Sequence, residues 1–266
     1  MKIKLAKGSS PVMFLVAYVL VLSGLFLSGC GAGNPFPSGS YERGMLFVEQ
    51  EKYPEAISAL EAFVRHSPTD TLAAEAQYQK AMTYMNMEEY PLCVVELQIL
   101  AKDYPTSTRA EDAMFQMGIA YYRQVGGVER DITGAHEARL QFLKFSQTYP
   151  QSKHMDEVIS TMRDISDLMV RKRLKQVHVF RQLKRYEAVV MTLGLVLEEE
   201  TNSRLLDQVL WERGEGALRI NEYYLAVEMY ERLIRDFPDS DYRHSAQKAL
   251  AKLNEDLDAE LDADDD

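Results

Sequence analysis

Small and bulky residues recur along the chain at fixed distances from a series of prolines. The residue twelve positions before each of four prolines is small, and for three of these the residue twelve positions further back is small as well. A bulky residue stands four positions after each nearer small residue. The prolines are Pro68, Pro105, Pro150 and Pro238; the nearer small residues are Ala56, Cys93, Ala138 and Ala226; the more distant ones are Gly44, Ala81 and Gly214.

This period of about 37 residues is typical of stacked helix pairs. Small residues let two helix axes approach closely, and bulky residues fill the space around the crossing. Proline cannot continue a helix, so each proline marks the end of a pair. The pattern therefore predicts an all-α fold, a tetratricopeptide-type helical repeat solenoid of about five helix pairs. Cys93 occupies one of the small positions, so we expect a buried core thiol there.

Two departures from the period divide the predicted solenoid. Gly118 and Ala138 are 20 residues apart, which indicates an insertion of eight residues carried by 126–131. Hydrophobic residues then keep helical spacing from Met155 toward Leu183, which predicts one long helix. We expect repeats 1–3 over residues 41–152, and the long helix with repeats 4–5 over residues 153–253, the last part of which forms a capping helix.

The beginning of the chain predicts export and lipid anchoring. A basic start precedes an apolar run from Val12 to Leu27, which is shorter than the roughly 20 residues that span a membrane. The stretch Leu27-Ser28-Gly29-Cys30 resembles the bacterial lipobox, which implies cleavage before Cys30 and lipid attachment to its thiol. We expect a signal peptide over residues 1–29 and a flexible linker over 30–40. The alternatives are an ordinary signal peptide with an incidental cysteine, or an N-terminal membrane helix.

The residue after the cysteine bears on localisation. In lipoproteins of this kind an aspartate there implies retention at the inner membrane, whereas this chain has Gly31. The resemblance therefore implies the outer membrane, with the protein lipid-anchored on the periplasmic face.

Charge limits the classes of partner. The formal net charge is −11, which argues against nucleic acid. Much of this charge lies in residues 254–266, which predict an acidic, disordered tail. A basic block, Arg171-Lys172-Arg173 with Lys175, interrupts the acidic pattern. It is either a solvated helix face or a contact for an acidic partner surface or lipid headgroups.

Lipobox, linker and repeats together resemble the BamD family, the lipoproteins of the outer-membrane β-barrel assembly machine. The specific support is the run from Gly127 to Asp131 with the helix sequence 135–139 after it, and the run from Tyr186 to Val190. The resemblance implies a non-catalytic adaptor that binds BamA, a barrel protein, beside other assembly lipoproteins, and recognises unfolded barrel precursors. The acidic tail has no match in the family pattern, and Thr192 stands where some relatives carry arginine.

Other functions are considered beside this one. The five histidines have no pair at metal-ligand spacing, and Gly126-Gly127 lacks the lysine and hydroxyl of a phosphate loop. We therefore expect no catalytic residue, no metal and no cofactor. The alternatives are another envelope repeat lipoprotein, serving pilus or cell-wall assembly, and an envelope enzyme built on a repeat scaffold.

The first helices of the repeats carry a ladder of aromatic residues and methionines. Its rungs lie three positions before, one position after and four positions after the small crossing residue. An aromatic and methionine ladder suits an extended segment that ends in an aromatic residue, because methionine adapts to many shapes. The alternative is that these side chains pack against neighbouring repeats. The candidate peptide groove comprises Tyr41, Met45, Tyr78, Met82, Met85, Phe115 and Tyr122.

Overall fold

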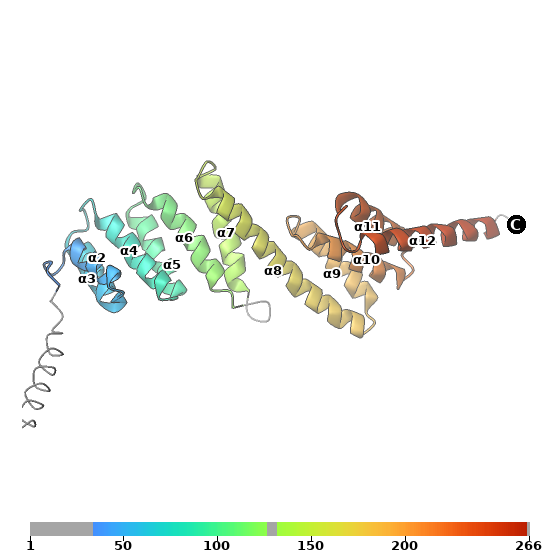
Figure 1. The fold of residues 1–266 in the computed structure, drawn as a ribbon, viewed down its shortest axis with the longest axis horizontal. Coiled ribbons are helices and arrows are strands. Elements are labelled where there is room, and N and C mark those ends of the chain that lie inside the picture. Colours follow the sequence, from blue (N-terminus) through green and yellow to red (C-terminus); the bar gives the residue numbers. More distant parts are fainter. Residues whose placement is uncertain (1–33, 127–131, 265–266) are drawn as a thin grey trace, which may run out of the picture.

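The computed structural model describes residues 34–126 and 132–264, and within these ranges every regular element is an α-helix (Figure 1). The signal peptide, Cys30, Gly31 and most of the insertion therefore lie outside the described residues. The all-α prediction is confirmed. The helices are α2 (Tyr41–Glu49), α3 (Tyr53–His66), α4 (Ala73–Asn86), α5 (Tyr90–Asp103), α6 (Ala110–Arg123), α7 (Thr133–Thr148), α8 (Met155–Gln182), α9 (Tyr186–Glu199), α10 (Leu206–Leu218), α11 (Tyr223–Asp236) and α12 (Arg243–Asp264).

Consecutive helices pair and stack into an elongated solenoid, with α12 projecting from one end (Figure 1). The first helices of the five units are α2, α4, α6, α8 and α10, and the second helices are α3, α5, α7, α9 and α11. Helix α8 has 28 residues and belongs to two cores. Its first half, with Val158 and Ile165, packs in one cluster with Phe142, while Val170 and Val177 pack in another with Leu193. This long helix therefore joins the first three units to the last two.

The helix crossings use the small residues that define the period. A Cβ atom added to Gly118 would lie 2.5 Å from the ring of Phe142, and one added to Gly214 would lie 2.6 Å from the ring of Tyr230. Glycine is required at these positions because the bulky residue of the second helix lies directly against the backbone of the first. Cys93 occupies an equivalent position on the second helix of its unit and is fully buried, and burial raises the pKa of its thiol to about 12.

The turns between the two helices of units one, two, four and five are closed by backbone bonds of the Schellman type. In four units one residue adopts a positive φ, and the following N–H donates to the carbonyl five residues earlier. None of these residues is a glycine, so the sequence gives little sign of the motif. The positive-φ residues are Glu51, Glu88, Lys184 and Asn221.

The start of each following unit is fixed by a side chain two residues before the helix N-cap. The Ser107 hydroxyl accepts a bond from the N–H of Arg109 at 3.1 Å, and Ser152 accepts one from His154 at 3.0 Å. Such acceptors satisfy N–H groups that the helix leaves free. In the other units the acceptors are Asp70, Ser203 and Ser240.

The C-terminal end differs from the prediction made from sequence. Residues 254–266 are predicted to form a disordered tail, but α12 continues to Asp264. No glycine or proline follows Leu253, and the acidic residues alternate with alanine and leucine, which favour helix. Helix propensity thus outweighs charge repulsion over this stretch.

Repeat two supplies a test of the crossing, because it pairs Ala81 with Leu97 where repeat three pairs Gly118 with Phe142. We expect Gly118→Ala to lower the free energy of unfolding by about 1–3 kcal/mol, since the added methyl overpacks the ring. Combining it with Phe142→Leu should recover part of that loss. Chemical denaturation measures the free energy of unfolding of all three variants. If the double variant loses as much stability as the two single variants lose together, the proposed contact is contradicted.

Candidate functional site

The predicted ladder lies on the first helices, on a surface that we call the first-helix face. Tyr78, Met82 and Met85 follow one side of α4 at helical spacing, and all three are partly buried against the core of their unit. Tyr41 and Met45 occupy the same places on α2. The side chains of the ladder therefore lie in rows along the first helices, but they differ in their exposure to solvent.

Phe115 does not line an open groove, which corrects its assignment from sequence. Its side chain is only 2 % exposed, within the core of the third unit. The ring stacks on the imidazole of His154, with centroids 4.1 Å apart and an interplanar angle of 6°. His154 is the N-cap residue of α8, so the following unit covers this rung.

The same cover recurs in two other units. The guanidinium of Arg109, the N-cap residue of α6, lies 4.8 Å from the ring centroid of Tyr78. Tyr242, just before α12, stacks on Trp211 at 6.1 Å and 18°. In both pairs the covering residue follows 31 positions after the rung; for Phe115 and His154 the separation is 39, larger by the eight-residue insertion. Tyr78, Phe115 and Trp211 therefore pack against the neighbouring repeat.

Charged side chains tie the cover in place between units two, three and four. Arg109 Nη2 donates to Glu75 Oε1 at 3.0 Å, and Arg109 Nη1 donates to Asp112 Oδ2 at 3.0 Å. Asp112 also contacts His154 Nε2 at 2.9 Å and Lys153 Nζ at 3.1 Å. Burial disfavours the Asp112 carboxylate, but hydrogen bonds from His154, Lys153 and Arg109 outweigh it and lower the pKa of Asp112.

The rungs one and four positions beyond the crossing are half-buried. Met45, Met82, Met85 and Tyr122 are partly exposed. Each packs one side against its own core cluster and presents the remainder to solvent. These four side chains are therefore a part of the first-helix face that a ligand can contact.

A cluster of charges from α8 and the start of α10 lies near Tyr122 of this stripe. Asp167 is 1 % exposed and accepts hydrogen bonds from the hydroxyl of Ser203 at 2.8 Å and the N–H of Arg204 at 2.8 Å. Burial opposes ionisation of Asp167, but the bonds from Ser203 and Arg204 lower its pKa. The guanidinium of Arg204 also pairs with Asp164, so the cluster joins α8 to the start of α10.

The basic block is exposed on the second half of α8. Arg171 lies 3.8 Å from Asp167, within the cluster just described. Lys172 and Arg173 line a cavity of about 240 Å³ together with Glu199 and Glu200. Glu200 is 5 % exposed and is paired with Arg139 of α7 at 2.7 Å, so one carboxylate of this cavity is already neutralised.

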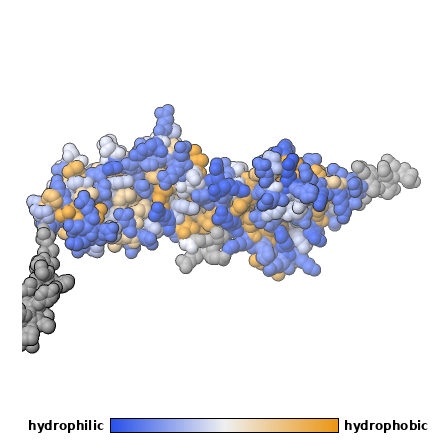
Figure 2. All heavy atoms as spheres, in the orientation of Figure 1, coloured by the Kyte–Doolittle hydropathy of each residue, from blue (hydrophilic) through white to orange (hydrophobic). Residues whose placement is uncertain are grey.

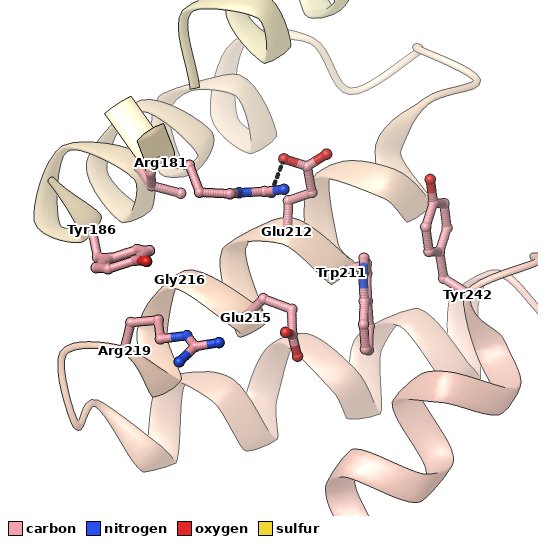
Figure 3. A pocket seen from close by; sticks show the side chains of 9 residues that line it. Arg181, Tyr186, Trp211, Glu212, Glu215, Gly216, Arg219 and Tyr242 are labelled. Atoms are coloured by element: carbon pink, nitrogen blue, oxygen red, sulfur yellow. Dashed lines mark hydrogen bonds and ion pairs between the residues drawn. The ribbon is translucent and has the colours of Figure 1, made fainter. Parts of the chain in front are cut away.

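A second cavity, of about 440 Å³, opens on the last two units (Figure 3). Tyr186 and Arg219 lie on one side, Trp211 and Tyr242 on the other, with Glu215 between them. Glu215 accepts a hydrogen bond from the hydroxyl of Tyr230 at 2.8 Å, and Arg181 pairs with Glu212 across the opening. Here the first-helix face changes from methionine to aromatic and charged side chains.

Other kinds of site are not found among the described residues. No group of histidine, cysteine and carboxylate side chains there is arranged to hold a metal ion. No helix in residues 34–126 and 132–264 is long and apolar enough to cross a membrane. On the face seen in Figure 2, hydrophilic surface dominates and hydrophobic surface forms separate patches.

The covering network makes stability depend on pH through Asp112. Because its pKa is lowered in the folded state, its contribution is present above the unfolded value near 4 and is lost as pH falls through the folded value. We expect Asp112→Asn to cost about 1–2 kcal/mol of unfolding free energy at pH 7. The difference from the parent protein should shrink at pH 3. Urea denaturation at both values checks this, and an equal difference at the two would contradict it.

Comparison with known proteins agrees with the repeat architecture. The model of the family YfiO, described as outer membrane lipoprotein, matches residues 36–211, and a tetratricopeptide repeat model matches residues 208–240. A search of curated proteins finds no match.

Similar solved structures include TTC0263, a thermophilic tetratricopeptide protein of Thermus thermophilus, at 17% identity over 80% of this chain and 96% of that chain, with a TM-score of 0.33. The apo form of RapI shares 17% identity over 88% of this chain and 62% of that chain, with a TM-score of 0.36. The tetratricopeptide domain of P58(IPK) shares 14% identity over 94% and 71%, with a TM-score of 0.34.

The family model covers more than half of the chain, from the linker into α10, and includes the insertion whose sequence carries the resemblance noted above. Family and repeat fold together point to a scaffold rather than an enzyme. The chain belongs to the YfiO family of outer membrane lipoproteins, the BamD family that its sequence resembles.

Proposed function

We propose that the protein is a lipid-anchored adaptor of the outer-membrane β-barrel assembly complex, which binds a BamA-like barrel protein and recognises unfolded barrel precursors. Membership of the family supports this assignment. The single observation on the molecule that carries it is the partly exposed stripe of Met45, Met82, Met85 and Tyr122 on the first-helix face. Other assembly lipoproteins are expected as further partners.

The stripe has the chemistry that precursor recognition requires. Barrel precursors differ in sequence but share apolar and aromatic side chains in their terminal strands. Methionine side chains have three rotatable bonds and a polarisable sulfur, so one surface adapts to many such segments. The stacked units place equivalent side chains of α2, α4 and α6 in series, which suits an extended ligand.

Anchoring through Cys30 is part of the proposal. The lipobox predicts that acyl chains on this cysteine hold the protein in the outer membrane, with its repeats in the periplasm. We expect Cys30→Ser to release the protein from outer-membrane fractions of cells depleted of its assembly partners. Sucrose-gradient fractionation measures this, and continued co-sedimentation of the variant with outer membrane in those cells would contradict the anchor.

Peptide recognition is tested on the exposed rungs. Because Tyr78 lies beneath Arg109, we choose Met82→Ala with Met85→Ala, and Met191→Ala on the outer side of α9 as the matched control. A labelled peptide from the C-terminal strand of a barrel precursor should bind the double variant at least about tenfold more weakly, a loss near 1.4 kcal/mol. Fluorescence anisotropy measures binding and thermal denaturation measures the fold.

The control variant should bind the peptide as the parent does, and the double variant should keep its cooperative melting. Unchanged peptide binding by the double variant would contradict the assignment of the stripe. Loss of the fold together with loss of binding would show that these methionines serve the core instead.

A further inference from the structure

A third cavity lies on the opposite side of the repeats, between the second helices of units two and three. Its volume is about 490 Å³. Met114, Met117 and Tyr121 of α6 contribute to its floor, while α5 and α7 form its two walls. Each of the two wall helices supplies one glutamine and one lysine. These are Gln98 and Lys102 on α5, and Gln141 and Lys144 on α7.

The same place between units one and two is filled by the chain itself. Lys80 directly precedes the small crossing residue of its helix, as Met117 does. Its Nζ lies 3.0 Å from Oε1 of Glu96 and 3.5 Å from Oε2 of Glu61. Gln77 donates to the carboxylate of Glu96 at 2.6 Å. Lys80, Gln77 and Glu96 are all buried. A network of charged and amide groups therefore occupies this position in the first pair of units.

Between units four and five the position is also filled. Arg213 directly precedes the crossing residue there and donates to the sulfur of Met229 at 3.7 Å. Its guanidinium lies against Gly194, where an added Cβ would be only 3.1 Å from Nη2. The long side chain of arginine thus uses the space that a glycine leaves free.

In units two and three, methionine and glutamine replace these charged groups. Met117 stands where units one and two have Lys80 and units four and five have Arg213. Gln98 and Gln141 stand where the first pair has Glu61 and Glu96. Among the residues that line the groove no cation crosses the gap, so the groove stays open over an apolar floor. Lys80 and Arg213 show that a long side chain can fill the equivalent position, whereas Met117 leaves it open between units two and three.

Both charged side chains that line the groove are lysines, and the Glu137 carboxylate on α7 lies outside this lining but near Tyr121. Lys102 and Lys144 are exposed, and among the residues that line this groove there is no carboxylate. The chain as a whole has a net charge of −11. The wall helices also carry exposed hydrophobic side chains outside the groove lining; they are Ile99, Leu140 and Leu143, at 38%, 62% and 43% exposure.

We propose that this groove binds an extended segment of a partner protein in which apolar side chains are flanked by acidic residues. The apolar side chains enter above Met114 and Met117, and the carboxylates pair with Lys102 and Lys144. Gln98 and Gln141 already donate through their amide nitrogens, to the Tyr121 hydroxyl and the Met114 carbonyl. Their side-chain oxygens accept bonds from the N–H groups of the segment. This docking site is separate from the first-helix face.

The test uses a fluorescein-labelled synthetic peptide of about twelve residues in which leucine and phenylalanine alternate with aspartate. A peptide with the same apolar residues and lysine in place of aspartate serves as the charge control. Anisotropy titrations with the full mature chain should show binding of the acidic peptide that weakens as salt rises. The lysine peptide should bind at least about tenfold more weakly.

Two variants locate the binding. Lys102→Glu with Lys144→Glu changes only exposed side chains, and Met117→Lys with Gln141→Glu recreates the Lys80–Glu96 pair inside the groove. Each should weaken binding of the acidic peptide at least about tenfold. Lys248→Glu with Lys252→Glu on α12 makes the same change in net charge and should leave binding unaltered.

Equal binding of the acidic peptide to the parent and to the Lys102/Lys144 variant would overturn the proposal, whatever the second variant does. Equal binding of the acidic and lysine peptides would overturn it as well. Phosphatidylglycerol vesicles are titrated in parallel. If the two lysines are needed for vesicle binding while the acidic peptide does not bind, the groove serves a lipid surface and the peptide assignment is wrong.

Discussion

The close crossing of the two helices in each unit is the contact on which the rest of the structure depends. A small residue on the first helix lets a bulky residue of the second lie against its backbone, as Gly118 and Phe142 show. This contact fixes the rotation of both helices about their axes. It thereby decides which side chains turn toward the next unit, which face solvent on the first helices, and which border the space between the second helices.

The helix pairs and their crossings could be predicted from the sequence, because prolines mark helix ends and small residues mark the crossings. The cover on the ladder could not be predicted so easily. It is made by Arg109 and His154, polar residues that a hydrophobic pattern does not select, and their 31- and 39-residue separations from Tyr78 and Phe115 become meaningful only once the units are stacked. The prediction for the acidic end is wrong for a different reason, since its charge suggests disorder while its alanines and leucines favour helix.

The same repeat presents different chemistry at different places. On the first-helix face, methionines of α2 and α4 give way to aromatic and charged groups around Trp211 (Figure 3). Between the second helices, buried charges at Lys80 give way to the open groove over Met117. Because the crossings hold the backbones of the units in similar positions, the side chains at equivalent positions set the chemistry of each surface.

The most direct test of the account is to map where a barrel-derived peptide binds. Methionine methyl resonances, assigned by single substitutions, report on both faces of the protein at once. The account predicts that a peptide from the C-terminal strand of a barrel precursor shifts the resonances of Met45, Met82 and Met85 and leaves those of Met114 and Met117 in place. Shifts confined to Met114 and Met117, or none at all at saturating peptide, would contradict it.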